Sequence, residues 1–102
     1  MAELHVYLEN GFEHDLVTIS VDDEEHTKSD VNTRYQVGLA ALVELSGVEL
    51  DAAGTAIVRI ALPERGLSAE ATVDPAATPY VRVDVTEGQL VVRLDSSQPR
   101  LA

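Results

Sequence analysis

The sequence lacks cysteine and tryptophan altogether, and its 102 residues include only one phenylalanine and three tyrosines. Without cysteine the chain has no disulfides, no thiol nucleophile and no thiolate-ligated metal. No apolar run approaches the ~18 residues of a membrane span, so we expect no transmembrane helix. The first residues lack the basic stretch followed by an apolar one that is typical of a secretion signal, so we expect no such signal. Together these absences favour a cytoplasmic protein.

Basic residues are also scarce, because 7 lysines and arginines accompany 18 acidic residues, for a formal net charge of −11. Such a charge repels nucleic-acid phosphates and anionic lipid surfaces, so we expect neither as a partner. Residues 1–51 carry 12 acids against 2 basic residues, whereas residues 52–102 carry 6 acids against 5 arginines. Solubility is the simplest interpretation of this charge, and a cation site or a basic partner is the alternative.

Hydrophobic residues make up 45% of the chain, enough to bury a core in one domain of this size. Turn-forming residues recur about every ten positions, a spacing typical of all-β proteins. Between the turns apolar and polar residues alternate, as in strands with one buried face. The alternating apolar sets are Leu4, Val6 and Leu8; Val17, Ile19 and Val21; Ala56, Val58, Ile60 and Leu62; Leu67, Ala69, Ala71 and Val73; Val81, Val83 and Val85; and Leu90, Val92 and Leu94.

We therefore predict an all-β fold, an antiparallel two-sheet β-sandwich of seven or eight strands that is immunoglobulin-like in the broad sense. It would occupy residues 1–95 as a single domain, followed by a C-terminal tail at 96–102. Segment 35–45 is ambiguous, since its apolar residues alternate as in a strand while its alanines and leucines also favour a helix. The β-rich surroundings favour a strand there. Glu87-Gly88 predicts a tight hairpin turn between the last two strands.

The most distinctive local feature is the acidic segment 22–30. Clustered carboxylates on a sandwich loop are a common way to bind calcium. The candidate ligands are Asp22, Asp23, Glu24 and Asp30. Their spacing departs from the EF-hand pattern, and adjacent side chains of an extended chain point to opposite sides. A hairpin between the first two strands would place the second acidic loop, 9–15, at the opposite end from Asp22. A polar hairpin tip is therefore the simpler interpretation, and a calcium-type site is the alternative.

Catalytic patterns are missing from the sequence. The three histidines, His5, His14 and His26, do not show the spacing of a zinc site. Neither a nucleophile elbow nor a glycine-rich phosphate loop is present. We therefore expect no enzymatic activity and no cofactor. Phe12 lies in a loop, where we expect it to fold back and plug the end of the sandwich rather than anchor a partner.

The last strand favours a role in protein binding. Segment 89–95 is apolar on both faces, which indicates that a second surface covers it, whereas segment 24–28 is short and charged, as suits a protected edge. The candidate partner-binding residues are Tyr80, Arg82, Leu90, Val91 and Val92. Cover of Val91 by the tail at Pro99 and Leu101 is the competing explanation.

From these features we predict a non-catalytic protein-binding or accessory module that acts through a strand edge or an end loop. Its partner would be another protein or a second copy of the chain, bound through the hairpin at 79–95. The alternative function is a cation-dependent ligand-binding domain that uses segment 22–30.

Overall fold

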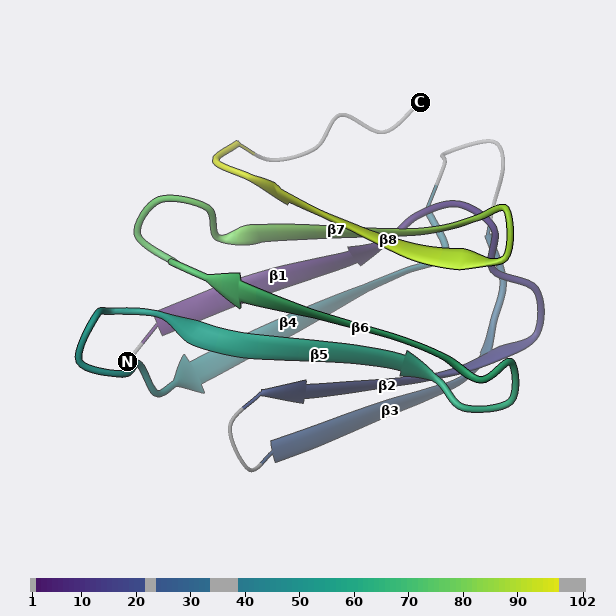
Figure 1. Ribbon diagram of the computed structural model, residues 1–102, viewed down its shortest axis with the longest axis horizontal. Coiled ribbons are helices and arrows are strands. Elements are labelled where there is room, and N and C mark those ends of the chain that lie inside the picture. Colours follow the sequence, from purple (N-terminus) through teal and green to yellow (C-terminus); the bar gives the residue numbers. More distant parts are fainter. Residues whose placement is uncertain (1, 22–23, 34–38, 98–102) are drawn as a thin grey trace.

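The computed structural model describes residues 2–21, 24–33 and 39–97, and within these ranges it contains eight β-strands. Their bounds are β1 (Ala2–Leu8), β2 (Asp15–Val21), β3 (Glu24–Val31), β4 (Ala41–Val48), β5 (Ala56–Leu62), β6 (Leu67–Val73), β7 (Tyr80–Thr86) and β8 (Gln89–Asp95). The strands form two four-stranded sheets that lie face to face (Figure 1). Sheet A has the order β4-β1-β7-β8 and sheet B the order β3-β2-β5-β6. The predicted all-β, two-sheet sandwich is therefore confirmed.

Sheet A is mixed rather than wholly antiparallel, so that part of the prediction was wrong. β1 and β7 run parallel, from His5 opposite Tyr80 to Leu8 opposite Val83. The other strand pairs are antiparallel. Alternation along one strand shows which face is buried but not which way its neighbour runs, because strand direction depends on how distant segments are connected.

The expected hairpin between the first two strands was also wrong, because β1 belongs to sheet A and β2 to sheet B. Residues 9–14 instead form an arch that carries the chain from one sheet to the other (Figure 1). Phe12, 1% exposed, plugs the core beneath this arch as predicted. Gly11 has a φ of +87°, and a Cβ added there would lie 2.1 Å from the carbonyl oxygen of Val85, so only glycine fits.

The predicted inner faces form the core. Apolar side chains of β1, β2, β5 and β7 are almost completely buried between the sheets. The apolar residues of β6 and β8 are less covered, because these are edge strands. Leu94 departs furthest from its predicted place, since it remains 39% exposed although its alternation assigns it to the inner face. Apart from Phe12 the core is thus aliphatic. Its side chains are fully covered at the centre and less covered toward β8.

The two lateral sides of the sandwich differ. β6 and β8 lie against each other and close one side, whereas β3 and β4 stand farther apart on the other. β3 reaches Val31, three residues beyond the predicted segment 24–28. Within the ambiguous segment 35–45, residues 41–45 belong to strand β4, and residues 35–38 lie outside the described residues. Across those ranges no helix is long and apolar enough to span a membrane.

Candidate functional site

The predicted calcium ligands do not gather in the described part of the chain. Asp22 and Asp23 lie outside it. Glu24 begins β3 and Asp30 stands near its other end, about 20 Å apart at the usual rise per strand residue. Among the residues that the structure describes, no group of three or more histidine, aspartate or glutamate side chains is arranged to hold a metal ion. The calcium site stays a prediction, and no described contact supports it.

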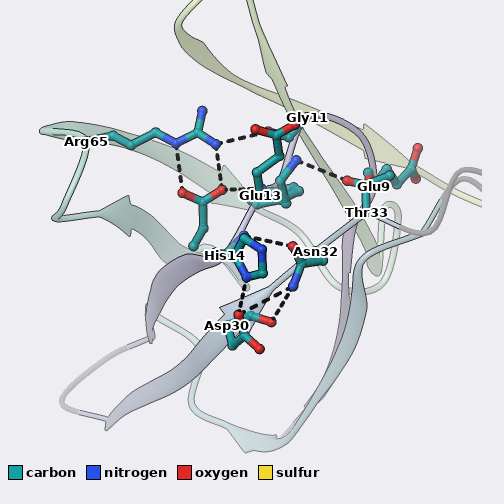
Figure 2. A network of polar contacts seen from close by, with 10 residues as sticks. Glu9, Gly11, Glu13, His14, Asp30, Asn32, Thr33 and Arg65 are labelled. Atoms are coloured by element: carbon teal, nitrogen blue, oxygen red, sulfur yellow. Dashed lines mark hydrogen bonds and ion pairs between the residues drawn. The ribbon is translucent and has the colours of Figure 1, made fainter.

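Asp30 contacts the arch instead (Figure 2). Its Oδ1 lies 2.6 Å from Nδ1 of His14, and the backbone N–H of His14 donates to Oδ1 of Asn32. His14 and Asp30 both adopt positive φ, +47° and +54°, an uncommon conformation for residues other than glycine. The hydrogen bond to Asp30 raises the pKa of His14 above its ordinary 6.5, and the same bond lowers the pKa of Asp30. This exposed pair fastens the arch to the end of β3.

Next to that pair, Thr33 joins the start of the arch to its middle. Its hydroxyl donates to the carbonyl of Glu9 at 2.7 Å and accepts the N–H of Phe12 at 3.0 Å, while its own N–H donates to the carbonyl of Phe12. Each of these groups is satisfied inside the protein (Figure 2). Buried polar groups satisfied in this way hold a conformation and leave little capacity for a ligand.

An ion pair with a buried carboxylate anchors the arch to sheet B. The Asp15 side chain is 5% exposed and accepts two hydrogen bonds from Arg65, both of 2.7 Å. Asp15 also accepts the N–H of Glu13, and Arg65 reaches the carbonyl of Gly11 at 3.3 Å (Figure 2). A bidentate arginine–carboxylate pair is geometrically specific. The turn between β5 and β6, which carries Arg65, therefore positions the arch.

The outer face of sheet A carries a second cluster of charges. Glu9, with 4% of its side chain exposed, accepts hydrogen bonds from Arg82 at 2.7 and 3.0 Å and lies 3.6 Å from Arg93. Arg93 also bonds Asp84 at 2.7 Å, and Arg82 reaches Asp95 at 3.5 Å. The bond to Glu9 raises the pKa of Arg82 further above its ordinary value. The cluster ties the end of β1 to both strands of the final hairpin.

Aromatic side chains lie beside this cluster on the same face. The rings of His5 and Tyr80 stack with centroids 5.2 Å apart, and Tyr7 tilts against Tyr80 at 6.2 Å. Tyr7 is buried. These rings contact one another across neighbouring strands, as cross-strand pairs ordinarily do.

The five predicted partner-binding residues divide between two faces. Tyr80 and Arg82 lie on the outer face of sheet A, and Val91 joins them there because it stands opposite Asp84. Leu90 and Val92 face inward and pack against the core. The five therefore do not make one surface, and the alternation of the β7–β8 hairpin is the sequence signal that separates them.

β8 nevertheless has the features of an accessible edge. It is the last strand of sheet A, and in the described residues its only ladder partner is β7. β6 contacts it from the facing sheet but forms its own ladder with β5. Val91 and Leu94, one on each face of β8, are each 39% exposed. Within the described residues, the edge of β8 that faces away from β7 therefore combines open backbone groups with exposed apolar side chains. Pro99 and Leu101, the predicted cover of Val91, lie outside those residues.

Surface depressions elsewhere show fewer features of a binding site. One of about 450 Å³ lies over β5, where Leu50 and Ile57 are exposed. Two charged residues in it are already engaged, because Asp51 accepts hydrogen bonds within its own turn and Arg59 pairs with Glu70. The lowered pKa of Asp51 comes from those turn bonds. We therefore assign the depression no chemistry.

Sequence reasoning missed the buried carboxylates Glu9, Asp15 and Asp84. We had expected the acids of the chain to be solvated or to bind a cation, but these three pair with arginines that are 9 to 73 residues distant in the sequence. A weak sequence signal existed for Asp84, because it shares one face of β7 with the oppositely charged Arg82. Comparison with protein-family models, curated proteins and solved structures finds no match to this chain.

Proposed function

We propose that the chain is a non-catalytic protein-binding module, immunoglobulin-like in the broad sense and cytoplasmic, whose partner binds the free edge of β8. The single observation that carries this proposal is the edge position of β8 together with the exposure of Val91 and Leu94. An edge strand with apolar side chains on both faces is a template for pairing with another chain.

The composition of β3 and β6, two of the other three edge strands, supports the choice of β8. β3 turns Glu24, His26 and Lys28 toward the facing sheet, since these residues stand opposite inward-facing positions of β2. Charged side chains pointing inward from an edge strand oppose pairing with another chain. β6 presents mainly small side chains and Glu70. β8 combines several large apolar residues with a single cation, Arg93.

The geometry of the hairpin supports a particular mode of binding. Glu87 and Gly88 have φ values of +52° and +73° and form a two-residue turn between Thr86 and Gln89. In such a turn the flanking pair exchanges backbone hydrogen bonds, and bonded pairs then alternate along the ladder. Leu90, Val92 and Leu94 consequently direct their N–H and C=O groups away from β7. An extended segment of a partner would add to sheet A through these groups.

The test is a titration of the isotopically labelled protein with a synthetic peptide of sequence Gln89–Asp95. We expect amide shift changes concentrated in β7 and β8, because the peptide adds beside β8. A scrambled peptide of the same composition is the control. Equal changes with both peptides, or changes confined to other strands, contradict the proposal.

A proline variant provides a second arm of the same experiment. Leu94→Pro removes an N–H that points to the free edge and leaves the ladder to β7 intact, so the variant should fold and fail to bind the peptide. Circular dichroism verifies the fold. Unchanged peptide binding by a folded Leu94→Pro variant would contradict pairing of the partner along β8 as far as Leu94.

A further inference from the structure

We infer that the partner of β8 is a second copy of this chain, paired antiparallel about a two-fold axis through Val92. This inference rests on the proposed function, since it names the occupant of the same edge. A symmetric dimer of this kind would join two copies of sheet A into one continuous eight-stranded sheet.

The geometry of antiparallel strands limits the registers open to such a dimer. In an antiparallel pair, directly opposed residues point their side chains to the same face of the sheet. The two-fold axis must therefore pass through a residue of β8, so that each residue is opposed by one an even number of positions away. An axis at Val92 opposes Val92 to itself, Leu90 to Leu94 and Gln89 to Asp95, and it engages all seven residues of β8. Axes at Val91 or Arg93 engage only five strand residues each.

Charge then separates these registers. The axis at Arg93 sets that guanidinium against its own copy, and like charges directly opposed across strands repel. The axis at Val91 leaves Leu94 without an opposing strand residue. The axis at Val92 creates no like-charge pair, and it covers each exposed Leu94 with Leu90 of the other copy. Val91 then packs along the aliphatic stem of Arg93.

The overall charge also favours this side of the molecule for self-association. Residues 52–102, which form β5 to β8, carry a net charge of only −1, whereas residues 1–51 carry −10. Two copies that meet at β8 bring their nearly neutral halves together and keep their acidic halves apart. Repulsion between the copies is then smaller than in a dimer that meets at the acidic edges β3 or β4.

Sedimentation equilibrium on the intact chain with paired substitutions at Gln89 tests the inference. Gln89 is exposed, and an axis at Val92 places it opposite Asp95 in both halves of the dimer. Gln89→Lys should lower the dimer dissociation constant about 2- to 30-fold, and Gln89→Glu should raise it by a similar factor. Thr27→Lys and Thr27→Glu on β3 make the same charge changes at an exposed position away from β8 and should have no effect.

Each outcome distinguishes one idea from another. If Gln89→Lys instead raises the dimer dissociation constant and Gln89→Glu lowers it, the axis passes through Val91, because Gln89 would then face Arg93. That result overturns the assigned register. A dimer whose dissociation constant neither substitution changes overturns it as well. A chain that stays monomeric at high micromolar concentration yet binds the β8 peptide overturns the homodimer and leaves the proposed function standing. A dimer that survives in a folded Leu94→Pro variant overturns the register at Val92, because that register pairs each Leu94 with Leu90 of the other copy.

Discussion

Gly11 illustrates how a single position decides the path of the chain between the sheets. Its positive φ turns the arch away from β1, and the arch passes so close to Val85 that no side chain fits. The backbone bond from Val85 N–H to the carbonyl of Asn10 lies at the same place. The sequence shows an Asn-Gly pair, but the close approach to β7 belongs to the fold alone.

Gly11→Ala is therefore expected to destabilise the protein more than Gly54→Ala. Both glycines have positive φ, but a Cβ at Gly54 meets nothing within 4 Å. Gly54→Ala should lower the free energy of unfolding by about 1 kcal/mol through backbone strain alone, and Gly11→Ala by about 1–3 kcal/mol more through the clash with Val85. Urea denaturation of both variants measures the difference. Equal losses would contradict the close approach.

The His14–Asp30 pair predicts a defined pH window. The folded pKa of His14 is raised above 6.5, so its contribution to stability is complete below pH 6.5 and is lost as pH rises through the folded value. The folded pKa of Asp30 is lowered from 3.8, so its contribution is present above pH 3.8 and is lost as pH falls through the folded value. The pair is therefore strongest between these two limits.

Asp30→Asn should return the pKa of His14 toward 6.5, which an NMR titration of the imidazole protons measures directly. The hydrogen bond to Asp30 is the principal cause of the raised value, ahead of the charges of Glu13 and Asp15. Glu70→Gln, a change on β6 where the carboxylate pairs with Arg59, is the matched control and should leave the titration of His14 unchanged. An unaltered His14 pKa in Asp30→Asn would refute the assignment.

At the scale of elements, the arch and the β5–β6 turn act together. Arg65 follows the end of β5 and holds Asp15 at the start of β2 through two short bonds. Arg59, within β5, makes a comparable pair with Glu70, but 64% and 48% of those two side chains are exposed. The two arginines differ mainly in the burial of the acid that they contact, which makes them a natural comparison.

Arg65→Met should destabilise the protein by about 1–3 kcal/mol, because it leaves the buried Asp15 carboxylate without its charged partner. Arg59→Met should change the free energy of unfolding by less than about 1 kcal/mol, as is usual for exposed ion pairs. Thermal and urea unfolding of the two variants provide the measurement. Equal effects would mean that burial of Asp15 adds nothing to the pair.

At the scale of the whole molecule, the acidic residues gather toward one lateral side of the sandwich. The acidic residues 1–51 form β1 to β4, and β3 and β4 line the more open side of the sandwich. The nearly neutral residues 52–102 supply β5 to β8 and the closed side. One lateral side of the protein is thus strongly negative, and repulsion within it opposes the compact state.

Sodium chloride should consequently raise the melting temperature, because screening relieves that repulsion. We expect a modest rise at 0.5 M salt and an equal one in calcium chloride of the same ionic strength, the result for a loop without a specific ion site. A larger effect of calcium that disappears when Asp22 and Asp23 are both replaced by alanine would revive the calcium alternative. A flat or falling response to sodium chloride would mean that the acids are already compensated.

The sequence by itself determined the strands and their buried faces. Alternation along sets such as Val17, Ile19 and Val21 reports one apolar side directly, because successive side chains of a strand point in opposite directions. The burial of Phe12 followed instead from its large apolar side chain. The β-rich surroundings favoured a strand over a helix for segment 35–45, of which residues 41–45 lie in β4. These properties are local, and each can be derived from a few consecutive residues.

Only the tertiary structure decided which strands became neighbours. The parallel pairing of β1 with β7, the crossing of the arch between sheets and the burial of Glu9 beside Arg82 all join segments far apart in the chain. The separation of Glu24 from Asp30 likewise depends on the full length of β3. The alternation of apolar residues is the same whichever strand lies beside a given strand and in whichever direction that neighbour runs. These features therefore followed from packing two sheets around one core.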